Sequence, residues 1–451
     1  MTINKKYLMI SIVLCLSLCA AQIVGSTILI LACLGAFMLF IGWICSHDYT
    51  LPIMLFFLPW SPLLKLSPTS FSFYTFATVL ICLISIVKNR FSFKNYHIKA
   101  GICILFLTLL SKLIDGDGLS FAYIAFLMMI VLFPTVKEEI HKHKYEFLQV
   151  VVFFSLGVTI SSLCAMYFAN YGNIRKYINV HEYLTIVRRC GFYGDPNFYT
   201  AQVLAAMSGA MILVMQQKKK GTMVSLVALI LLLFYCGMLS GSKSFAIVAA
   251  ILVLLWVVSI LKMRGRAGVK LILLGFLVFA GIYVATSVLF SGLIQVIATR
   301  FLSSNDANSF TTGRVGLWLS YFEEIMGNVK VFFLGRGFTN VKVNGRGSHN
   351  TILQIVYQFG VVGAPVLLYW IICFWQDTLR GLEKHVTLDI NLLMVLIGSF
   401  MPWLAIDMLF FDEFFLLQWY VLVAMGASQP IIKQQTMEKE KNGSYGGKVW
   451  T

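Results

Sequence analysis

The stretch SFAIVAAILVLLWVVSIL, residues 244–261, runs without a single charged side chain. An α-helix of about 20 apolar residues is long enough to cross a lipid bilayer. Lys243 precedes the stretch, and Lys262 and Arg264 follow it closely. The stretch therefore predicts a membrane-spanning helix with positive charge at each end.

Similar apolar runs fill most of the chain. Of its 451 residues 59% are hydrophobic and 12% are charged, whereas a soluble domain has roughly 25% charged residues. Candidate spans lie near residues 7–24, 27–45, 50–66, 71–87, 100–114, 119–134, 147–169, 198–215, 221–239, 244–261, 269–290, 350–375, 389–408 and 411–428. Several are short, and the proline-containing stretch 50–68 is either a span or a re-entrant segment. We expect an all-α, polytopic integral membrane protein with about 12 to 14 transmembrane helices and a long external loop that carries short helices.

The lysines and arginines of the short loops indicate the orientation. With the N-terminus in the cytoplasm, the short lysine-rich loops all fall on the cytoplasmic side, at residues 88–99, 135–146, 216–220, 262–270 and 376–388. The positive-inside rule predicts this distribution for the correct orientation. We therefore expect a transmembrane domain over residues 1–430 and a disordered cytoplasmic tail over residues 431–451.

The formal net charge is +16. In a soluble protein this charge would suggest a nucleic-acid ligand, but in a membrane protein basic residues first indicate which loops are cytoplasmic. We therefore expect no nucleic acid. Two long loops, residues 170–197 and 291–349, fall outside and are also basic. Their arginines are suited to bidentate binding of phosphate. An external basic surface at membrane level fits a lipid-linked diphosphate.

The first external loop ends in RRCGFYGDPNFYT, residues 188–200. Asp195 or Asn197 can cap a helix, and Pro196 has the backbone angle that a first helical turn needs. The motif is therefore either an ordinary capped start of the next span or part of a site. Arg188 and Arg189 either meet lipid headgroups or bind a substrate.

A second motif, LSGSKSFAIVAA at residues 239–250, is a tight external turn with Lys243 at its apex. A lysine in such a turn either extends to the membrane interface or binds an anion.

The long external loop contains SFTTGRVGLWLSYFEEI, residues 309–325. Residues 314–326 have helical spacing, and one stripe of that helix carries Val315, Trp318, Leu319 and Phe322. We expect this helix to lie on the membrane surface or to pack over the external mouth of the spans.

The same loop ends in FLGRGFTNVKVNGRGSHNTILQIVYQFGVVG, residues 333–363, with His349 and Asn350 at the start of another span. A lone histidine at a span end is more often structural, but three separate arginine or lysine sites accompany this one. A neutral imidazole can take the proton of an attacking hydroxyl, and arginines can stabilise a leaving diphosphate. These residue types together are suited to a glycosyl transfer from a lipid diphosphate.

The carboxylates expected outside do not have the pattern of a metal site. They are Asp115 and Asp117 around a glycine, and the late cluster Asp407, Asp412 and Glu413. None stands in the first loop, where metal-dependent lipid-phosphosugar transferases carry theirs. We expect no metal and no other cofactor.

Taken in order, four motifs resemble the O-antigen ligase/polymerase superfamily of bacterial membrane proteins. They are RRCGFYGDPNFYT, SGSKSFAIVAA, TTGR with a following tryptophan, and LGRGF…SHNTILQIVYQFGVVG. The resemblance covers about residues 185–365, with compatible spans on both sides.

This resemblance implies an inverting, metal-independent glycosyltransferase that uses undecaprenyl-diphosphate-linked glycan outside the bacterial cytoplasmic (inner) membrane. By the same resemblance, His349 is the base and Arg314 a diphosphate ligand. Lys243 stands where the family has arginine, and Ser244 follows it instead of glycine. We therefore expect a second arginine to help bind the diphosphate, with Arg189 slightly favoured over Arg188. The residues expected to shape the site are Asp195, Pro196, Asn197, Asn350, Gly335 and Gly337.

The acceptor is the open question. We favour a polymerase that joins repeat units into O-antigen, capsule or exopolysaccharide, because polymerases are the more divergent group. The alternatives are a ligase that transfers glycan to a lipid A core or another acceptor, and a flippase for lipid-linked oligosaccharide. A transporter typically has charges near the bilayer midplane and repeated halves, and the sequence shows no internal repeat. The expected partners are the lipid-linked oligosaccharide, membrane lipid, a chain-length regulator and a flippase.

Overall fold

A computed structural model describes residues 4–45, 49–89, 95–115, 147–178, 181–183, 186–217, 219–264, 313–338, 343–381 and 390–407, with residue 311 and short pieces within 123–135 and 268–284. Two predicted segments lie outside the described residues, the candidate span 411–428 and the tail 431–451. Most of the candidate span 269–290 and most of the external loop up to residue 312 also lie outside them.

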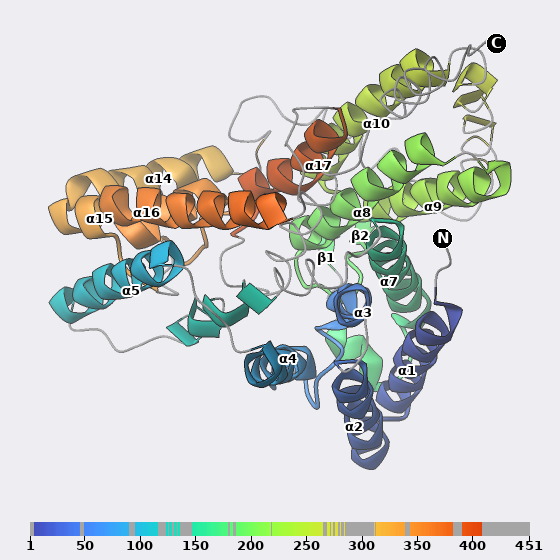
Figure 1. Ribbon diagram of the computed structural model, residues 1–451, viewed down its shortest axis with the longest axis horizontal. Helices are drawn as coiled ribbons and strands as arrows, with labels where there is room; N and C mark the ends of the chain where they lie inside the picture. The colour runs from blue at the N-terminus through green and yellow to red at the C-terminus, as the bar shows by residue number, and fades with distance from the viewer. Residues whose placement is uncertain are drawn as a thin grey trace, which may run out of the picture.

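The described elements are almost all helices (Figure 1). In chain order they are α1 (Lys5–Val24), α2 (Thr27–Ile44), α3 (Thr50–Phe57), η1 (Leu58–Trp60), α4 (Phe73–Asn89), α5 (Asn95–Asp115), α7 (Phe147–Phe168), η2 (Asn173–Tyr177), α8 (Pro196–Gln216), α9 (Lys220–Leu239), α10 (Lys243–Arg264), α14 (Arg314–Gly327), α15 (Val329–Leu334), α16 (Thr351–Gly381), α17 (Ile390–Phe400) and η3 (Met401–Ala405). A small antiparallel hairpin of β1 (His181–Tyr183) and β2 (Ile186–Arg188) pairs His181 with Arg188.

In the described part of the chain, eight helices are long and apolar enough to cross a membrane, and three shorter apolar helices accompany them. This confirms the expected all-α, polytopic membrane fold. The total of 12 to 14 spans stays a prediction, because several candidate spans fall on residues that the structure does not describe.

Helix α8 is at the centre of the packing. Of its apolar segment 94% is buried, against 33% for α10 and 44% for α9. Small residues allow this close packing: a Cβ on Gly209 would lie 2.9 Å from Val151 on α7, and one on Gly398 of α17 would lie 2.7 Å from Ser208. Small residues at helix contacts are the usual means of close approach within a membrane.

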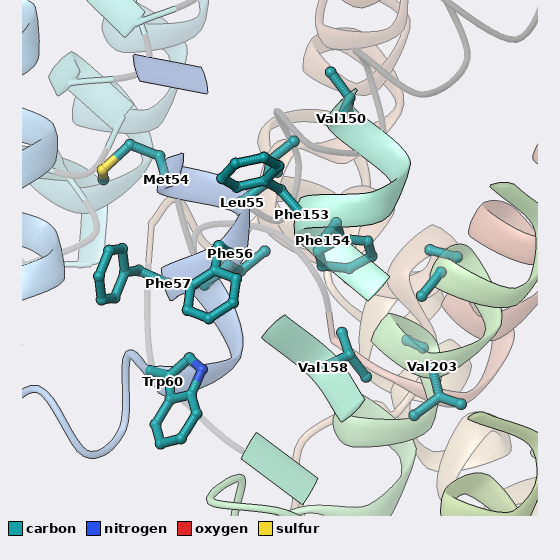
Figure 2. Packing of buried hydrophobic residues seen from close by; sticks show 14 of the residues in the cluster. Met54, Leu55, Phe56, Phe57, Trp60, Val150, Phe153, Phe154, Val158 and Val203 are labelled. Carbon is teal, nitrogen blue, oxygen red and sulfur yellow. The ribbon is translucent and has the colours of Figure 1, made fainter. Parts of the chain in front are cut away.

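The proline-containing stretch 50–68 begins as a short, fully buried helix, α3. It packs against α7, and Figure 2 shows Phe153 and Phe154 of α7 on one side of α3 and the Phe57 ring on the other side, where Phe57 meets Phe37 of α2 at 4.8 Å. The approach is close enough that a Cβ on Gly157 would lie 2.3 Å from the carbonyl oxygen of Phe56.

This stretch follows α1 from one end to the other. The ring of Tyr49 lies 5.1 Å from that of Tyr7 in the first turn of α1. The carbonyl oxygen of Lys65 accepts a hydrogen bond of 2.9 Å from Gln22 in the last turn of α1. Of the two sequence interpretations, the structure therefore favours a crossing segment over a re-entrant one.

Helices α14 and α15 lie beside α16, next to α5, on one side of the molecule in Figure 1. The predicted helix over 314–326 is confirmed, but its buried face differs from the expected stripe. Leu317, Tyr321 and Ile325 are buried against α16, whereas Leu319 and Phe322 are more than half exposed. The apolar residues of this helix occupy both faces, so spacing alone did not identify the packed one.

Helix α16 is interrupted at Gly360, where φ is 64°. The loop after α15 fills the break: the backbone amides of Arg336 and Gly337 donate to the carbonyl oxygens of Tyr357 and Gln358, at 2.8 and 2.9 Å. The Ser111 hydroxyl of α5 donates to the Gly335 carbonyl at 2.6 Å. These bonds satisfy the backbone groups that the interruption releases, as a segment inside a membrane protein requires.

Candidate functional site

Four helices begin around one pocket of about 400 Å³. Pro196, Lys243 and Arg314 are the first residues of α8, α10 and α14, and His349 stands two residues before α16. The pocket is lined by Arg188, Gly194, Asp195, Pro196, Asn197, Lys243, Ser244, Ile247, Val248, Thr311, Arg314, Trp318, Arg346, His349, Met401, Leu404 and Ala405. Helix N-termini carry partial positive charge, so their convergence favours an anionic ligand.

The pocket brings together residues from all four sequence motifs. Arg188, Lys243, Arg314 and His349 come from segments up to 161 positions apart in the chain (188 to 349) and line the same space. Nothing in their local sequence requires this meeting. It follows from the packing of α8 with α10 and of α14 with α16.

The start of α8 is capped as one of the sequence interpretations predicted. Oδ1 of Asp195 accepts hydrogen bonds from the backbone amides of Asn197 and Phe198, at 2.6 and 3.3 Å. Asp195 is thus the N-cap, and Pro196 occupies the first helical position, where its missing N–H costs nothing.

Asn197 connects this helix start to the turn before α10. Its Oδ1 accepts hydrogen bonds from the hydroxyls of Ser242 and Ser244, at 2.9 and 3.3 Å. Ser244 therefore has a hydrogen-bond partner of its own. These bonds fix the position of Lys243, which lies between the two serines and lines the pocket.

Of the two neighbouring arginines, Arg188 lines the pocket and Arg189 does not. The guanidinium of Arg188 donates through Nε to the carbonyl oxygen of Ser240, at 2.8 Å. The backbone amide of Arg189 donates to Leu239 at 3.0 Å, and its side chain interacts electrostatically with Tyr235 on α9. Of the two, only Arg188 is therefore placed in the candidate site, and the expected share of Arg189 in binding the diphosphate stays a prediction.

Arg314 begins α14 directly after Gly313, whose φ of 80° lets the chain enter the helix. Burial lowers the pKa of the Arg314 guanidinium, Asp195 and Asp407 oppose that shift, and Arg188 and Arg346 add to it. A guanidinium remains charged at neutral pH under such a shift. Arg314 therefore places a half-buried positive charge in the pocket.

Arg346 is a pocket cation that the sequence motifs did not single out. It ends a tight turn in which Asn344 and Gly345 have φ of 51° and 72°, and its amide donates to Val343 at 3.0 Å. Its carbonyl oxygen accepts from the Tyr321 hydroxyl at 2.9 Å, which ties the turn to α14. The only sequence signal was a basic residue three positions before His349.

His349 has a left-handed backbone, with φ of 47°. This conformation is uncommon for a residue with a side chain and persists where surrounding contacts enforce it. Asn350 follows as the cap of α16, because its Oδ1 accepts from the amides of Ile352 and Leu353 at 3.0 and 3.2 Å. This contact agrees with the expected structural role of Asn350.

The imidazole of His349 lines the pocket, and its Nδ1 is buried without a hydrogen-bond partner among the described residues. Burial lowers the pKa of His349 below its ordinary 6.5. Asp407 and Asp195 oppose this shift, and Arg314 and Arg346 reinforce it. The imidazole is therefore neutral at pH 7 and has a lone pair with which to accept a proton.

Asp407 is hydrogen-bonded to the backbone of His349 and does not itself line the pocket. It is the second site residue that sequence reasoning missed. Its Oδ2 accepts a hydrogen bond from the His349 amide at 3.0 Å, and its Oδ1 accepts from the Ser348 hydroxyl and, at 3.4 Å, from the Asn350 amide. The sequence showed Asp407 only as one member of a late acidic cluster. Its companions Asp412 and Glu413 lie outside the described residues.

Gly335 and Gly337 do not line the pocket. They have φ of 71° and 70° and fit against the break in α16, where a Cβ on Gly335 would lie 2.4 Å from Gln358. Gly335 lets the loop after α15 enter that break, and Gly337 lets it pass close to α5, where a Cβ would lie 2.9 Å from the Thr108 carbonyl oxygen.

One wall of the pocket is apolar. Ile247 and Val248 of α10 face it, as do Met401 and Leu404 of η3. Ile247 and Leu404 are also 39% and 45% exposed. The pocket lining thus combines cations with solvent-accessible apolar side chains.

Across the described ranges, no three His, Cys, Asp or Glu side chains stand together as ligands for a metal ion. The two carboxylates near the pocket, Asp195 and Asp407, accept hydrogen bonds from backbone amides.

No protein-family model, curated protein or solved structure matches the chain.

Proposed function

We propose that the chain is a glycosyltransferase of the bacterial cytoplasmic membrane that polymerises undecaprenyl-diphosphate-linked repeat units on the external face. The observation that carries the proposal is one pocket that holds both a neutral histidine and a group of cations, at the meeting point of four helix N-termini. Under the predicted orientation this pocket opens on the external side, where lipid-linked repeat units are polymerised.

The charge of the pocket fits a diphosphate. Arg188, Lys243, Arg314 and Arg346 contribute positive charge to its lining, against one lining carboxylate, Asp195. A lipid diphosphate is doubly negative, and arginines bind its oxygens in pairs. The cations are present before substrate binds, so they stabilise the charge that builds up on the leaving diphosphate without reorganisation.

The apolar side of the pocket fits the lipid. Ile247 and Leu404 line the pocket and are accessible to solvent. A polyprenyl chain that lies along them would remain in contact with the hydrocarbon of the bilayer. The diphosphate would then meet the cations at the membrane boundary.

The proposed reaction is a direct displacement. His349 accepts the proton of the acceptor hydroxyl, whose oxygen forms the new bond to the anomeric carbon of the donor sugar. The bond between that carbon and the diphosphate oxygen breaks on the opposite side, so the configuration inverts. The lipid diphosphate leaves with the electron pair and is held by Arg314 and its neighbouring cations.

The test is reconstitution of the purified protein in vesicles with lipid-diphosphate-linked repeat units. A ladder of products is expected from the wild type and none from His349→Ala, while Lys243→Arg retains activity because it keeps the charge. Long chains made by the His349→Ala protein would contradict the assignment of the base. Transfer to a lipid A core indicates a ligase, and translocation without a new glycosidic bond indicates a flippase.

A further inference from the structure

We infer that Asp407 is the positioning residue of this site: its carboxylate holds His349 in its left-handed backbone conformation and balances the positive charge that the imidazole gains on accepting a proton. The inference rests on the proposed function of His349 as a base.

Three donors from consecutive residues converge on this one carboxylate. They are the Ser348 hydroxyl and the backbone amides of His349 and Asn350. The two carboxylate oxygens share them, Oδ2 at 3.0 Å from His349 and Oδ1 at 3.4 Å from Asn350. A residue with φ of 47° needs such external support, and these bonds supply it.

The surroundings leave the carboxylate little freedom to move. Asp407 is 9% exposed, and a Cβ on Gly347 would lie 2.4 Å from its Oδ2. On either side, the Trp318 indole donates to the Ser348 carbonyl at 2.9 Å, and the Thr351 hydroxyl donates to the Ile406 carbonyl at 2.7 Å. The segment 348–351 is thus attached to both α14 and the chain after η3.

The charges around His349 make Asp407 the main electrostatic support of the protonated ring. Four charged residues act on the imidazole: Asp407 and Asp195 favour its protonated form, and Arg314 and Arg346 disfavour it. Asp407 has the largest effect of the four. Without it, the ring would face two guanidinium groups with only Asp195 as counter-charge.

An asparagine at this position separates charge from geometry. In Asp407→Asn, the amide oxygen can still accept from the His349 backbone, and the amide nitrogen can donate to the Ser348 hydroxyl, which is able to accept. The hydrogen-bond pattern is largely kept, and the negative charge is lost. A purely structural role for Asp407 predicts little change in such a variant.

The first measurement is the pH dependence of polymer formation by the Asp407→Asn protein in vesicles. Because the carboxylate favours the protonated ring, its loss should move the acidic limb of the profile about one unit lower in pH. We expect turnover at pH 7 to fall by up to about tenfold, with KM for the lipid diphosphate unchanged. An acidic limb that coincides with that of the wild type would overturn the inference.

The second measurement needs no glycan substrate. Diethyl pyrocarbonate modifies neutral imidazole, so its rate of reaction with His349, followed by mass spectrometry across pH, reports the protonation of that ring. Asp407→Asn should shift this profile to lower pH, and an unshifted profile would overturn the inference. Absence of polymer from the wild-type protein, together with a shifted profile, would contradict the proposed function alone.

A neighbouring position provides a variant that leaves Asp407 itself unchanged. The methyl group of Gly347→Ala would displace the carboxylate, so the modification profile of His349 should shift in the same direction as in Asp407→Asn. Gly327→Ala is the matched control, because a Cβ there meets nothing within 4 Å. Equal profiles for the Gly347→Ala and Gly327→Ala proteins would overturn the inference even if Asp407→Asn failed to fold.

Discussion

The Nε atom of Arg188 lies 2.8 Å from the carbonyl oxygen of Ser240, to which it donates a hydrogen bond. Arg188 ends β2, and Ser240 belongs to the turn that leads to Lys243 and α10. The bond joins two segments that each contribute a cation to the pocket. It also distinguishes Arg188 from Arg189, which does not line the pocket.

Arg188→Ala is expected to lower kcat/KM for the lipid-diphosphate substrate by about 10- to 100-fold, because it removes a charge-assisted contact worth about 1.5–3 kcal/mol. Arg189→Ala is the matched control and should stay within about twofold of wild type, a difference of about 0.4 kcal/mol. Both values come from initial rates of polymer formation in vesicles. Equal losses in the two variants would remove Arg188 from the site.

The wild-type rate is expected to fall only in acid. Burial lowers the pKa of His349 below 6.5, so the ring stays neutral and able to accept a proton through pH 7. As the pH drops through that lowered pKa, the ring becomes protonated and the base is lost. A pH–rate profile of the wild type measures this directly, and an acidic limb above pH 6.5 would contradict the assignment.

Glu324 connects α14 to the loop that enters the break in α16. Its Oε1 accepts hydrogen bonds from Nη2 of Arg336 at 2.6 Å and from the Tyr357 hydroxyl at 3.0 Å. Glu324→Gln should lower the free energy of unfolding by about 1–2 kcal/mol, because both donors lose a charged acceptor at a half-buried site.

The matched control for this change is Glu323→Gln, since Glu323 is exposed and adjacent in sequence. It should shift the unfolding free energy by less than about 0.5 kcal/mol. Reversible unfolding in mixed micelles measures both variants. Equal destabilisation would mean that the contacts of Glu324 contribute nothing of their own.

Gly360 is where α16 departs from helical geometry, and no other residue type fits there. A Cβ would lie 2.3 Å from the carbonyl oxygen of Phe333, in addition to the cost of φ at 64° for a residue with a side chain. Gly360→Ala should destabilise the protein by roughly 3 kcal/mol or more. Gly35→Ala in α2 meets nothing within 4 Å and should be neutral or slightly stabilising, as unfolding in mixed micelles would show.

Much of the architecture was predictable from residues read in order. Hydropathy identified the long spans, and the Asp195-Pro196 pair predicted a capped helix start that the structure confirms. The candidate cations Lys243 and Arg314 and the histidine at 349 also line the same pocket. These features depend on composition, charge or a local backbone signal, all of which are visible within a few neighbouring residues.

Other features depended on contacts between distant segments. In α14, apolar residues occupy both faces, and only the position of α16 decided that Tyr321 and Ile325 are the buried ones. Arg346 lines the pocket and Asp407 binds the His349 backbone only because folding brings their segments next to it. That Arg188 lines the pocket and Arg189 does not is likewise decided by the folded chain.

Composition and hydropathy were enough to identify a helical membrane protein with cations and a histidine concentrated in a few loops, because burial in a bilayer requires long apolar runs and excludes scattered charge. The tertiary structure alone decided which of those charges share a pocket. It also decided that a buried carboxylate from the chain after η3 supports His349. The physical reason is that hydropathy acts on each segment independently, whereas a site depends on distances between side chains that only helix packing sets.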